Sequence, residues 1–461
     1  MRARTSHQMA GFTWPQIIRL ALVQTAIGAM VVLTTSTMNR IMVVELGLAA
    51  MIPGALVALH YAVQMLRPRF GHGADRGKSR TLWIVGGLAV LALGTVLASI
   101  ATGLAGSDRL TGLSLATFAF LLIGMGVGAS GTNLLALVAA GVAPHRRGPA
   151  ATLMWTLMIA GFALTAGIAG SFLDPFSAGR LVLVTTIVAG LALTIGSLAT
   201  LGIERTMQAP SPSETAKSAG GAFSATLKDV WQESATRRFT LFVFISMLAY
   251  SAQDLVLEPF AGLIFSMSPG ETTQLAGMQH GGTFIGMIAV AVAGVLFARK
   301  HPGLLRVLCV TGCLGSALAF AALFTASRAG GDFPLVATVA TLGFFNGLFA
   351  VAAIGSMMGL ASGSGSDGSG SDESPRHGIR MGLWGAAQAI AFALGGFAGT
   401  ALVDLTLHFT GSNAHAYGSV FLVEGVGFVV SALLAWRCVG DRSGFGDHQR
   451  PVSNSFSGVT A

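Results

Sequence analysis

Stretches of about 20 consecutive apolar residues recur along the whole of this chain, and short polar or charged segments separate them. A helix of that length rises about 30 Å, which is enough to cross the hydrocarbon core of a bilayer. Charged residues make up only 10% of the sequence and hydrophobic residues 53%, whereas a water-soluble domain carries about 25% charged residues. The composition therefore predicts an all-α integral membrane protein and excludes a soluble one.

Twelve such spans can be delimited in the 461 residues. They are expected at residues 16–45, 50–66, 82–105, 112–141, 149–172, 180–202, 239–263, 274–298, 303–326, 333–361, 381–404 and 416–438. A polar segment separates the sixth span from the seventh, so the chain is predicted to fold as two six-helix halves. The expected parts are an N-terminal half (1–203), a cytoplasmic linker (204–238), a C-terminal half (239–440) and a disordered cytoplasmic tail (441–461).

The positive charges lie mainly on one side of this predicted topology. If the N-terminus is cytoplasmic, the only Lys or Arg on the outer side are Arg40, Arg109, Arg180 and Arg328, which leaves 23 of the 27 on the cytoplasmic side. Such a bias sets the orientation of membrane proteins, so both termini are predicted to be cytoplasmic. The net charge of +8 comes from short bursts between spans and not from one basic face, which argues against a nucleic-acid partner.

Six plus six helices around a polar linker is the layout of the major facilitator superfamily, whose halves are related by a pseudo-two-fold axis. Between the second and third spans, the segment Gly71-x-x-x-Asp75-Arg76-Gly77-Lys78-Ser79-Arg80 resembles the signature loop of that superfamily, although its second glycine comes one residue early. The resemblance implies that Gly71, Asp75, Arg76 and Arg80 clasp neighbouring helix ends and control gating. A plain topology-setting basic loop is the alternative.

Two carboxylates lie inside the seventh span, at Asp254 and Glu258, four residues apart and therefore on one helix face. A charge in the middle of a bilayer costs ~2.5–3.5 kcal/mol on insertion scales, so such groups usually face a partner or a cavity. The first span ends in a similar way, with Arg40 and Glu45, and in the superfamily layout these two spans face each other. We therefore expect Arg40 to pair with Asp254 as an outer gate. The alternative is that both carboxylates are structural groups at the membrane interface.

Four short segments carry a closer resemblance, at residues 22–25, 39–46, 67–69 and 253–259. Through them the chain resembles the PucC/LhaA family, the bacteriochlorophyll-delivery branch of the major facilitator superfamily in phototrophic bacteria, over roughly residues 15–440. The sequence Leu59-His60-Tyr61 ahead of Arg67 differs from PucC and LhaA themselves and indicates another member of the family.

This resemblance implies a protein of the cell inner (cytoplasmic or intracytoplasmic) membrane that supplies bacteriochlorophyll during assembly of light-harvesting complexes. Its expected partners are the lipid bilayer, bacteriochlorophyll or a precursor, light-harvesting or reaction-centre polypeptides, and pigment-synthesis enzymes. No covalent cofactor is expected, and the pigment would be a delivered ligand.

Four polar residues within predicted spans are candidate pigment or cavity ligands: His60, His280, Asn133 and Glu424. A neutral imidazole in an apolar helix is the usual axial ligand for the magnesium of a chlorophyll-type pigment, which makes the two histidines candidates. A lone histidine is nonetheless more often a hydrogen-bonded core residue. No Cys-x-x-Cys or Cys/His spacing indicates a metal site.

Two other functions fit the same fold. The first is a proton- or cation-coupled transporter of a small solute, with Asp254 or Glu424 carrying the proton. The second is a catalytic subunit of pigment synthesis, which would need Asp-x-x-x-Asp clusters to hold magnesium and diphosphate. The sequence has no such cluster on a predicted helix, no phosphate-binding loop and no zinc-protease motif. We therefore expect no catalytic residues and no enzymatic activity.

Overall fold

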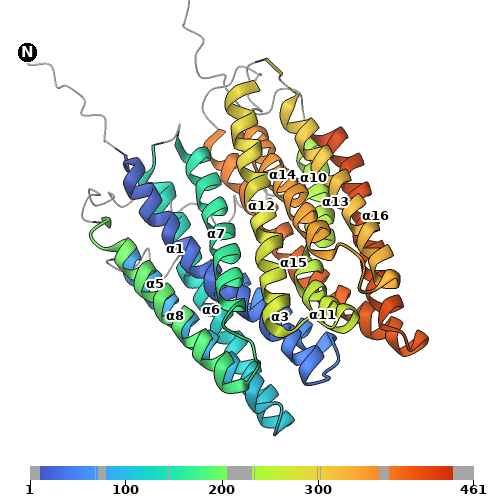
Figure 1. Cartoon of the computed structure of the whole chain (residues 1–461). Coiled ribbons are helices and arrows are strands. Elements are labelled where there is room, and N and C mark those ends of the chain that lie inside the picture. The colour runs from blue at the N-terminus through green and yellow to red at the C-terminus, as the bar shows by residue number, and fades with distance from the viewer. Residues whose placement is uncertain are drawn as a thin grey trace, which may run out of the picture.

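The computed structural model describes residues 11–67, 69–70, 79–143, 146–204, 231–232, 234–297, 300–301, 303–362 and 373–439. Within these ranges the regular structure is all helical, and the helices stand side by side in one bundle (Figure 1). Eleven of the described helices are long and apolar enough to cross a membrane, and a shorter apolar helix covers Met51–Leu66. The prediction of an all-α membrane protein is confirmed, with the second expected span as the short helix.

The helices occur where the apolar runs predict them. The first part of the chain contains α1 (Trp14–Val32) continued by η1 (Leu33–Thr37), α2 (Met38–Arg40) and η2 (Ile41–Glu45), then α3 (Met51–Val63) with η3 (Gln64–Leu66), α5 (Arg80–Leu104), α6 (Arg109–Gly141), α7 (Arg147–Gly170) and α8 (Ala178–Thr200). The second part contains α10 (Ser234–Ser251), α11 (Gln253–Phe265), α12 (Pro269–Phe297), α13 (Leu304–Ala329), α14 (Leu335–Ser362), α15 (Glu373–Thr410) and α16 (Asn413–Cys438). The seventh span comprises both α10 and α11.

Each part of the chain packs around its own apolar core. Leu88 and Phe120 are fully buried in the first core, and Phe320 and Phe428 in the second. Between the two parts, α7 packs against α12, α3 packs against α15, and α11 lies beside the end of the first helix. The predicted linker falls mostly outside the described residues and the predicted tail wholly outside them, so these two boundaries stay predictions.

Glycine allows close helix contacts, because small residues let backbones approach in lipid. A Cβ atom on Gly126 of α6 would lie 2.5 Å from the backbone nitrogen of Leu91 in α5, and one on Gly170 would lie 2.7 Å from the carbonyl oxygen of Gly270. No side chain fits at either position. At Gly86, in contrast, no described atom lies within 4 Å of the Cβ position, so that glycine has no packing role.

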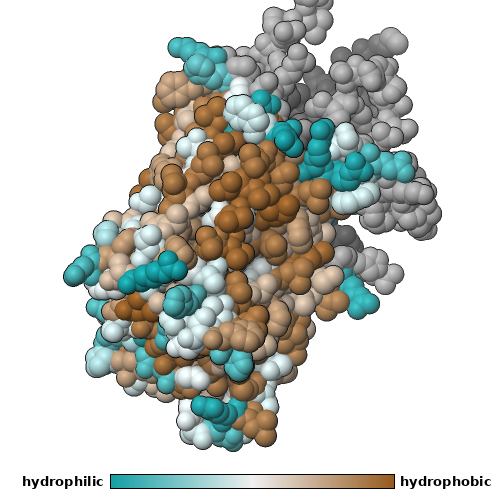
Figure 2. All heavy atoms as spheres, turned by 90° about the vertical axis from the view of Figure 1, so that its right-hand side faces the viewer, coloured by the Kyte–Doolittle hydropathy of each residue, from teal (hydrophilic) through white to brown (hydrophobic). Residues whose placement is uncertain are grey.

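Large apolar side chains cover the outside of the bundle. Figure 2 shows a broad hydrophobic surface on one face, with hydrophilic residues gathered mainly toward its ends. Leu110, Val295 and Leu318 are each more than 70% exposed, which is costly in water and favourable in lipid. We name the two ends of the bundle by residues that lie there, the Arg40 end and the Arg80 end.

Candidate functional site between the two halves

The two motifs that carry the family resemblance meet at a helix defect in α11. Pro259 lies inside this helix and has no N–H, so the carbonyl of Leu255, four residues earlier, loses its helical donor. Asn39 fills that position by donating its side-chain N–H to the Leu255 carbonyl at 2.6 Å. A buried carbonyl without a donor would be unfavourable, so the proline in one half explains the asparagine in the other.

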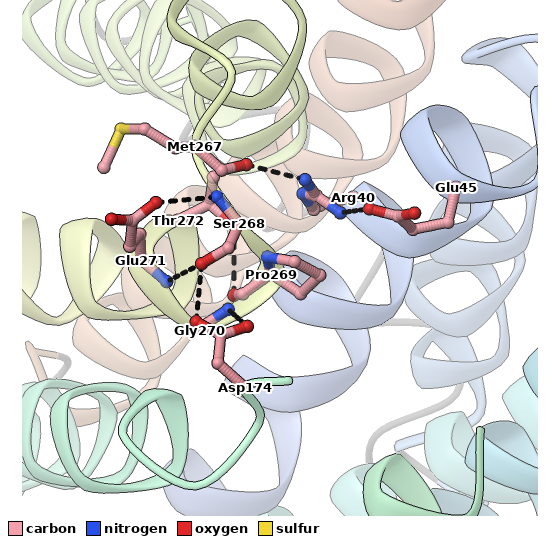
Figure 3. Close-up of polar contacts among 9 residues, drawn as sticks. All are labelled: Arg40, Glu45, Asp174, Met267, Ser268, Pro269, Gly270, Glu271 and Thr272. Carbon is pink, nitrogen blue, oxygen red and sulfur yellow. Dashed lines mark hydrogen bonds and ion pairs between the residues drawn. The ribbon is translucent and has the colours of Figure 1, made fainter. Parts of the chain in front are cut away.

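Arg40 is a buried cation, only 2% exposed, at the point where the two halves meet. Its guanidinium forms an ion pair with Glu45 and donates to the backbone carbonyl of Met267 at 2.8 Å (Figure 3). Gly262 leaves room for it, because a Cβ there would lie 3.1 Å from the guanidinium nitrogen Nη2.

The predicted ion pair between Arg40 and Asp254 is wrong. The guanidinium lies at the level of Gly262, which at 1.5 Å per residue is about 12 Å further along the helix than Asp254. The closer carboxylate from the seventh span is that of Glu258, which interacts electrostatically with Arg40. Arg40, Glu45 and Glu258 therefore lie together without Asp254, and their role as a gate stays a prediction.

Glu258 is held by hydroxyl groups rather than by a direct ion pair. Its Oε1 accepts a hydrogen bond from Ser36 of η1, while its Oε2 has no hydrogen-bond partner. Beside it, the hydroxyls of Thr37 and Thr273 form a second contact across the halves at 3.1 Å. The π-helical turn of η1 places these two adjacent hydroxyls at the interface, and such turns are common at functional sites.

Two carboxylates cap helix starts in the opposite half. Asp174, in the connection from α7 to α8, accepts from the Ser268 hydroxyl at 2.5 Å and from the Gly270 N–H at 3.1 Å, at the start of α12 (Figure 3). Asp404 of α15 accepts from the N–H groups of Ala50 and Met51, at 2.9 and 2.7 Å, at the start of α3. The first N–H groups of a helix lack intrahelical partners and attract negative charge, so each carboxylate fastens one half to the other.

The two caps repeat each other. In each half a carboxylate at or after the fifth helix caps the second helix of the other half, as a pseudo-two-fold axis requires. These caps, the Asn39 bond and the Arg40 cluster all join the halves at the Arg40 end. The structure is thus a conformation in which that end is closed.

Arg80 of the predicted signature loop contacts neighbouring helix ends, as the resemblance implied. Its guanidinium donates to the carbonyl of Ala136 in α6 at 2.9 Å. Glu204, just after α8, accepts from the backbone N–H of Arg80 at 2.6 Å and of Thr81 at 3.2 Å, and so caps α5. Gly71, Asp75 and Arg76 lie outside the described residues.

His60 takes part in a hydrogen-bonded chain. Arg67 donates to the Oε1 of Gln64, and since a guanidinium has only donors, the amide must turn its NH₂ group toward His60. The Gln64 nitrogen lies 2.9 Å from His60 Nε2, which therefore accepts, and the ring proton is on Nδ1. Neither ring nitrogen keeps a free lone pair for a metal.

His280 and Asn133 have different surroundings. His280 is 4% exposed, its ring lies 4.9 Å from that of Phe162 across the halves, and its Nδ1 has no hydrogen-bond partner. Asn133 donates to the carbonyl of Ala129 within its own helix at 2.8 Å, a structural contact. Of the two candidate axial ligands, His280 is the one whose ring forms fewer hydrogen bonds with described residues.

Glu424 and Asp254 lie on the interior side of the second half, on α16 and α11, and interact electrostatically with each other. Asp254 also interacts with two tyrosines, Tyr61 from α3 and Tyr250 from α10. Phe392 of α15 lies between these tyrosines, with ring centroids 5.5 Å from Tyr61 and 6.0 Å from Tyr250. Aromatic rings from both halves and two carboxylates from the second half thus lie near the middle of the bundle.

Sequence reasoning missed Ser36, Asp174, Gln253 and Asp404 as contacts of the site. Asp404 could have been found, since it is a carboxylate inside a predicted span and such groups have partners. Asp174 sits in a loop, where the sequence gives no signal that it reaches the other half.

Comparison with known proteins agrees with this geometry. A family model described as "PUCC protein" matches residues 37–443. "Bacteriochlorophyll synthase 44.5 kDa chain" of Rhodobacter capsulatus is 49% identical over 93% of this chain and 96% of its own. "Protein PucC" of the same species is 26% identical over 91% of each chain.

Among solved structures, a D-xylose-proton symporter superposes with a TM-score of 0.65 at 15% identity, over 93% of this chain and 98% of its own. At that identity the likeness shows the fold alone, and the predicted major facilitator fold is confirmed. The family match includes both motifs that meet at Pro259. This chain therefore belongs to the PUCC protein family.

Proposed function

We propose that this protein handles bacteriochlorophyll, or a precursor of it, in the membrane during assembly of light-harvesting complexes. The observation that carries the proposal is the family match over residues 37–443 together with the 49% identity to a relative named for bacteriochlorophyll. The same match supports light-harvesting or reaction-centre polypeptides and pigment-synthesis enzymes as partners.

The interior of the bundle suits a large planar and mostly apolar ligand. Tyr61, Tyr250 and Phe392 pack on one another and bring aromatic rings from both halves together, and aromatic rings can also stack on flat ligands. His280 is the residue best suited to ligate the pigment magnesium, because the described residues give its ring no hydrogen bond and it lies at the α7–α12 contact. In the proposed role the pigment enters from the Arg80 end or between helices while the Arg40 end stays closed.

We further propose that the protein is not itself a synthase, despite the name of its relative. Joining a prenyl diphosphate to a pigment needs carboxylates that hold magnesium. Within the described residues, no group of three or more His, Cys, Asp or Glu side chains is arranged to hold a metal. We also place both termini in the cytoplasm and the protein in the inner membrane, as the distribution of 23 of the 27 positive charges favours.

Deleting the gene in a phototrophic host tests the proposal. We expect light-harvesting complexes to be lost while free bacteriochlorophyll is still made, with restoration by the intact gene but not by a His280→Ala variant expressed at equal level. Complexes at normal abundance in the deletion strain would contradict the proposal. Loss of pigment itself would point to synthesis, and gradient-driven uptake of a small solute would point to the transporter alternative.

A further inference from the structure

Glu424 is a carboxylate in the interior of the second half, and no described Lys, Arg or His forms an ion pair with it. It is 2% exposed, and neither of its carboxylate oxygens has a hydrogen-bond partner in the described chain. The Glu424 carboxylate interacts with the carboxylate of Asp254 and lies near the backbone amide of Gln253. An unpaired buried carboxylate is strongly unfavourable in a medium of low dielectric constant.

Asp254 adds a second carboxylate without a basic partner. Its Oδ1 is buried without a hydrogen bond. The titratable groups that face the two carboxylates are Tyr61 of α3 and Tyr250 of α10. Neither carboxylate forms an ion pair with a described Lys or Arg, and Arg67 interacts with Tyr61. Within the described part of the chain, the two carboxylates therefore have no basic side chain as a partner.

A chain of amides leads into the same place. Ser316 of α13 donates to Asn346 of α14 at 2.9 Å, and Asn346 donates to the Oε1 of Gln253 at 3.0 Å. Gln253 is fully buried, and its Nε2 forms no hydrogen bond of standard geometry, although the Gln253 side chain lies beside the Tyr250 hydroxyl. Since the serine hydroxyl can either donate or accept, reversing the chain presents the Gln253 oxygen in place of its nitrogen. The site can thus offer a donor to a bare carboxylate or an oxygen to a cation.

We propose that Glu424 and Asp254, with Gln253 beside them, form a binding site for a proton or a small monovalent cation. The bound proton or cation supplies the positive charge that the described side chains do not place beside the two carboxylates. The amides of Asn346 and Gln253 can reverse their hydrogen bonds when it binds. The site lies in the second half, beside the Leu255 carbonyl that accepts the hydrogen bond from Asn39. It does not depend on the identity of the delivered ligand, so its failure would leave the pigment proposal standing.

Unfolding of the full-length, detergent-purified protein tests the site. The equilibrium constant is measured by titration with the choline salt of dodecyl sulfate in mixed micelles from pH 6 to 8.5, in NaCl or in choline chloride at equal ionic strength. For a proton site, stability falls as pH rises in both salts, by up to tenfold in the unfolding constant per pH unit for each proton bound only by the folded state. For a cation site, NaCl restores stability at pH 8.5 and choline chloride does not.

Either dependence should disappear in Glu424→Gln and weaken in Asp254→Asn. The matched control is Glu271→Gln, whose carboxylate is exposed and accepts from the Ser268 N–H, and which should keep the dependence of the original protein. A wild-type protein indifferent to pH and to sodium, or a Glu424→Gln variant with an unchanged profile, would overturn the proposal.

A second measurement guards against a variant that does not fold. Infrared difference spectra of the intact protein, recorded between pH 6 and 8.5 or on adding sodium, report carboxyl groups that lose a proton or bind an ion. We expect a carboxyl band that Glu424→Asp shifts and Glu271→Gln leaves in place. A spectrum without any carboxyl change in the intact protein would contradict the site.

Discussion

Replacing Asn39 by leucine should destabilise the protein through a carbonyl on the other half of the molecule. The Asn39 side chain is the donor to the Leu255 carbonyl at 2.6 Å, and Pro259 removes the alternative donor. An unsatisfied buried acceptor costs about 1–3 kcal/mol. Leucine has a similar volume, and it also removes the Asn39 oxygen, which is buried without a partner. The net loss in free energy of unfolding is therefore expected at the lower part of that range.

The Pro259→Ala background should relieve most of this loss, because residue 259 then supplies its own N–H to the Leu255 carbonyl. A double-mutant cycle on SDS unfolding in mixed micelles measures the effect, with an expected coupling of about 1 kcal/mol or more between the two positions. Asn133→Leu is the control, since that amide bonds within α6 and should show no coupling to Pro259→Ala. Equal losses from Asn39→Leu in both backgrounds would refute the reasoning.

Three further predictions concern helix starts and helix contacts. Asp404→Ala should remove the cap of α3 and lower the free energy of unfolding by about 0.5–2 kcal/mol. Hydrogen exchange at residues 50–51 should become faster, and unchanged exchange would argue against the cap. Gly343→Ala places a Cβ 1.9 Å from a carbonyl oxygen and should cost about 1–3 kcal/mol in SDS unfolding, whereas Gly86→Ala, in open space, should be neutral or stabilising. The side-chain hydroxyl of Thr111, with backbone N–H groups, lowers the pKa of Asp108 below 3.8. Its stabilisation of α6 is complete above that pH and is lost as pH falls through the lower folded value, so exchange at residues 110–111, corrected for intrinsic rate, should accelerate only below pH 3.8.

The sequence predicted the fold well because the signals that define it are local. Runs of apolar residues give the helix positions, and the structure places helices at all of the expected spans within the described residues. The helix that fits the prediction of a full membrane span least well is Met51–Leu66, which is shorter than the other membrane helices. It is nevertheless apolar, and it packs on both α6 and α15.

The site was less predictable, because it depends on the register between helices. That the motifs at 39–46 and 253–259 meet was correctly expected from the superfamily layout. Which residues pair was not, since a shift of about one helical turn decides whether Arg40 meets Asp254 or Glu258. The two π-helical segments within residues 33–45 turn the side chains that follow toward a different side of the helix. A simple periodicity in the sequence does not predict such segments. The caps by Asp174 and Asp404 need the folded arrangement of both halves.

The absorption spectrum of the purified protein tests the central claim most directly. The full chain is expressed in a host that makes bacteriochlorophyll and is purified in mild detergent, beside a His280→Ala variant and a His408→Ala control from the end of α15. The account predicts bound bacteriochlorophyll in the original protein and in the control, and reduced pigment in the His280 variant. A colourless protein from a pigment-rich host would contradict pigment handling.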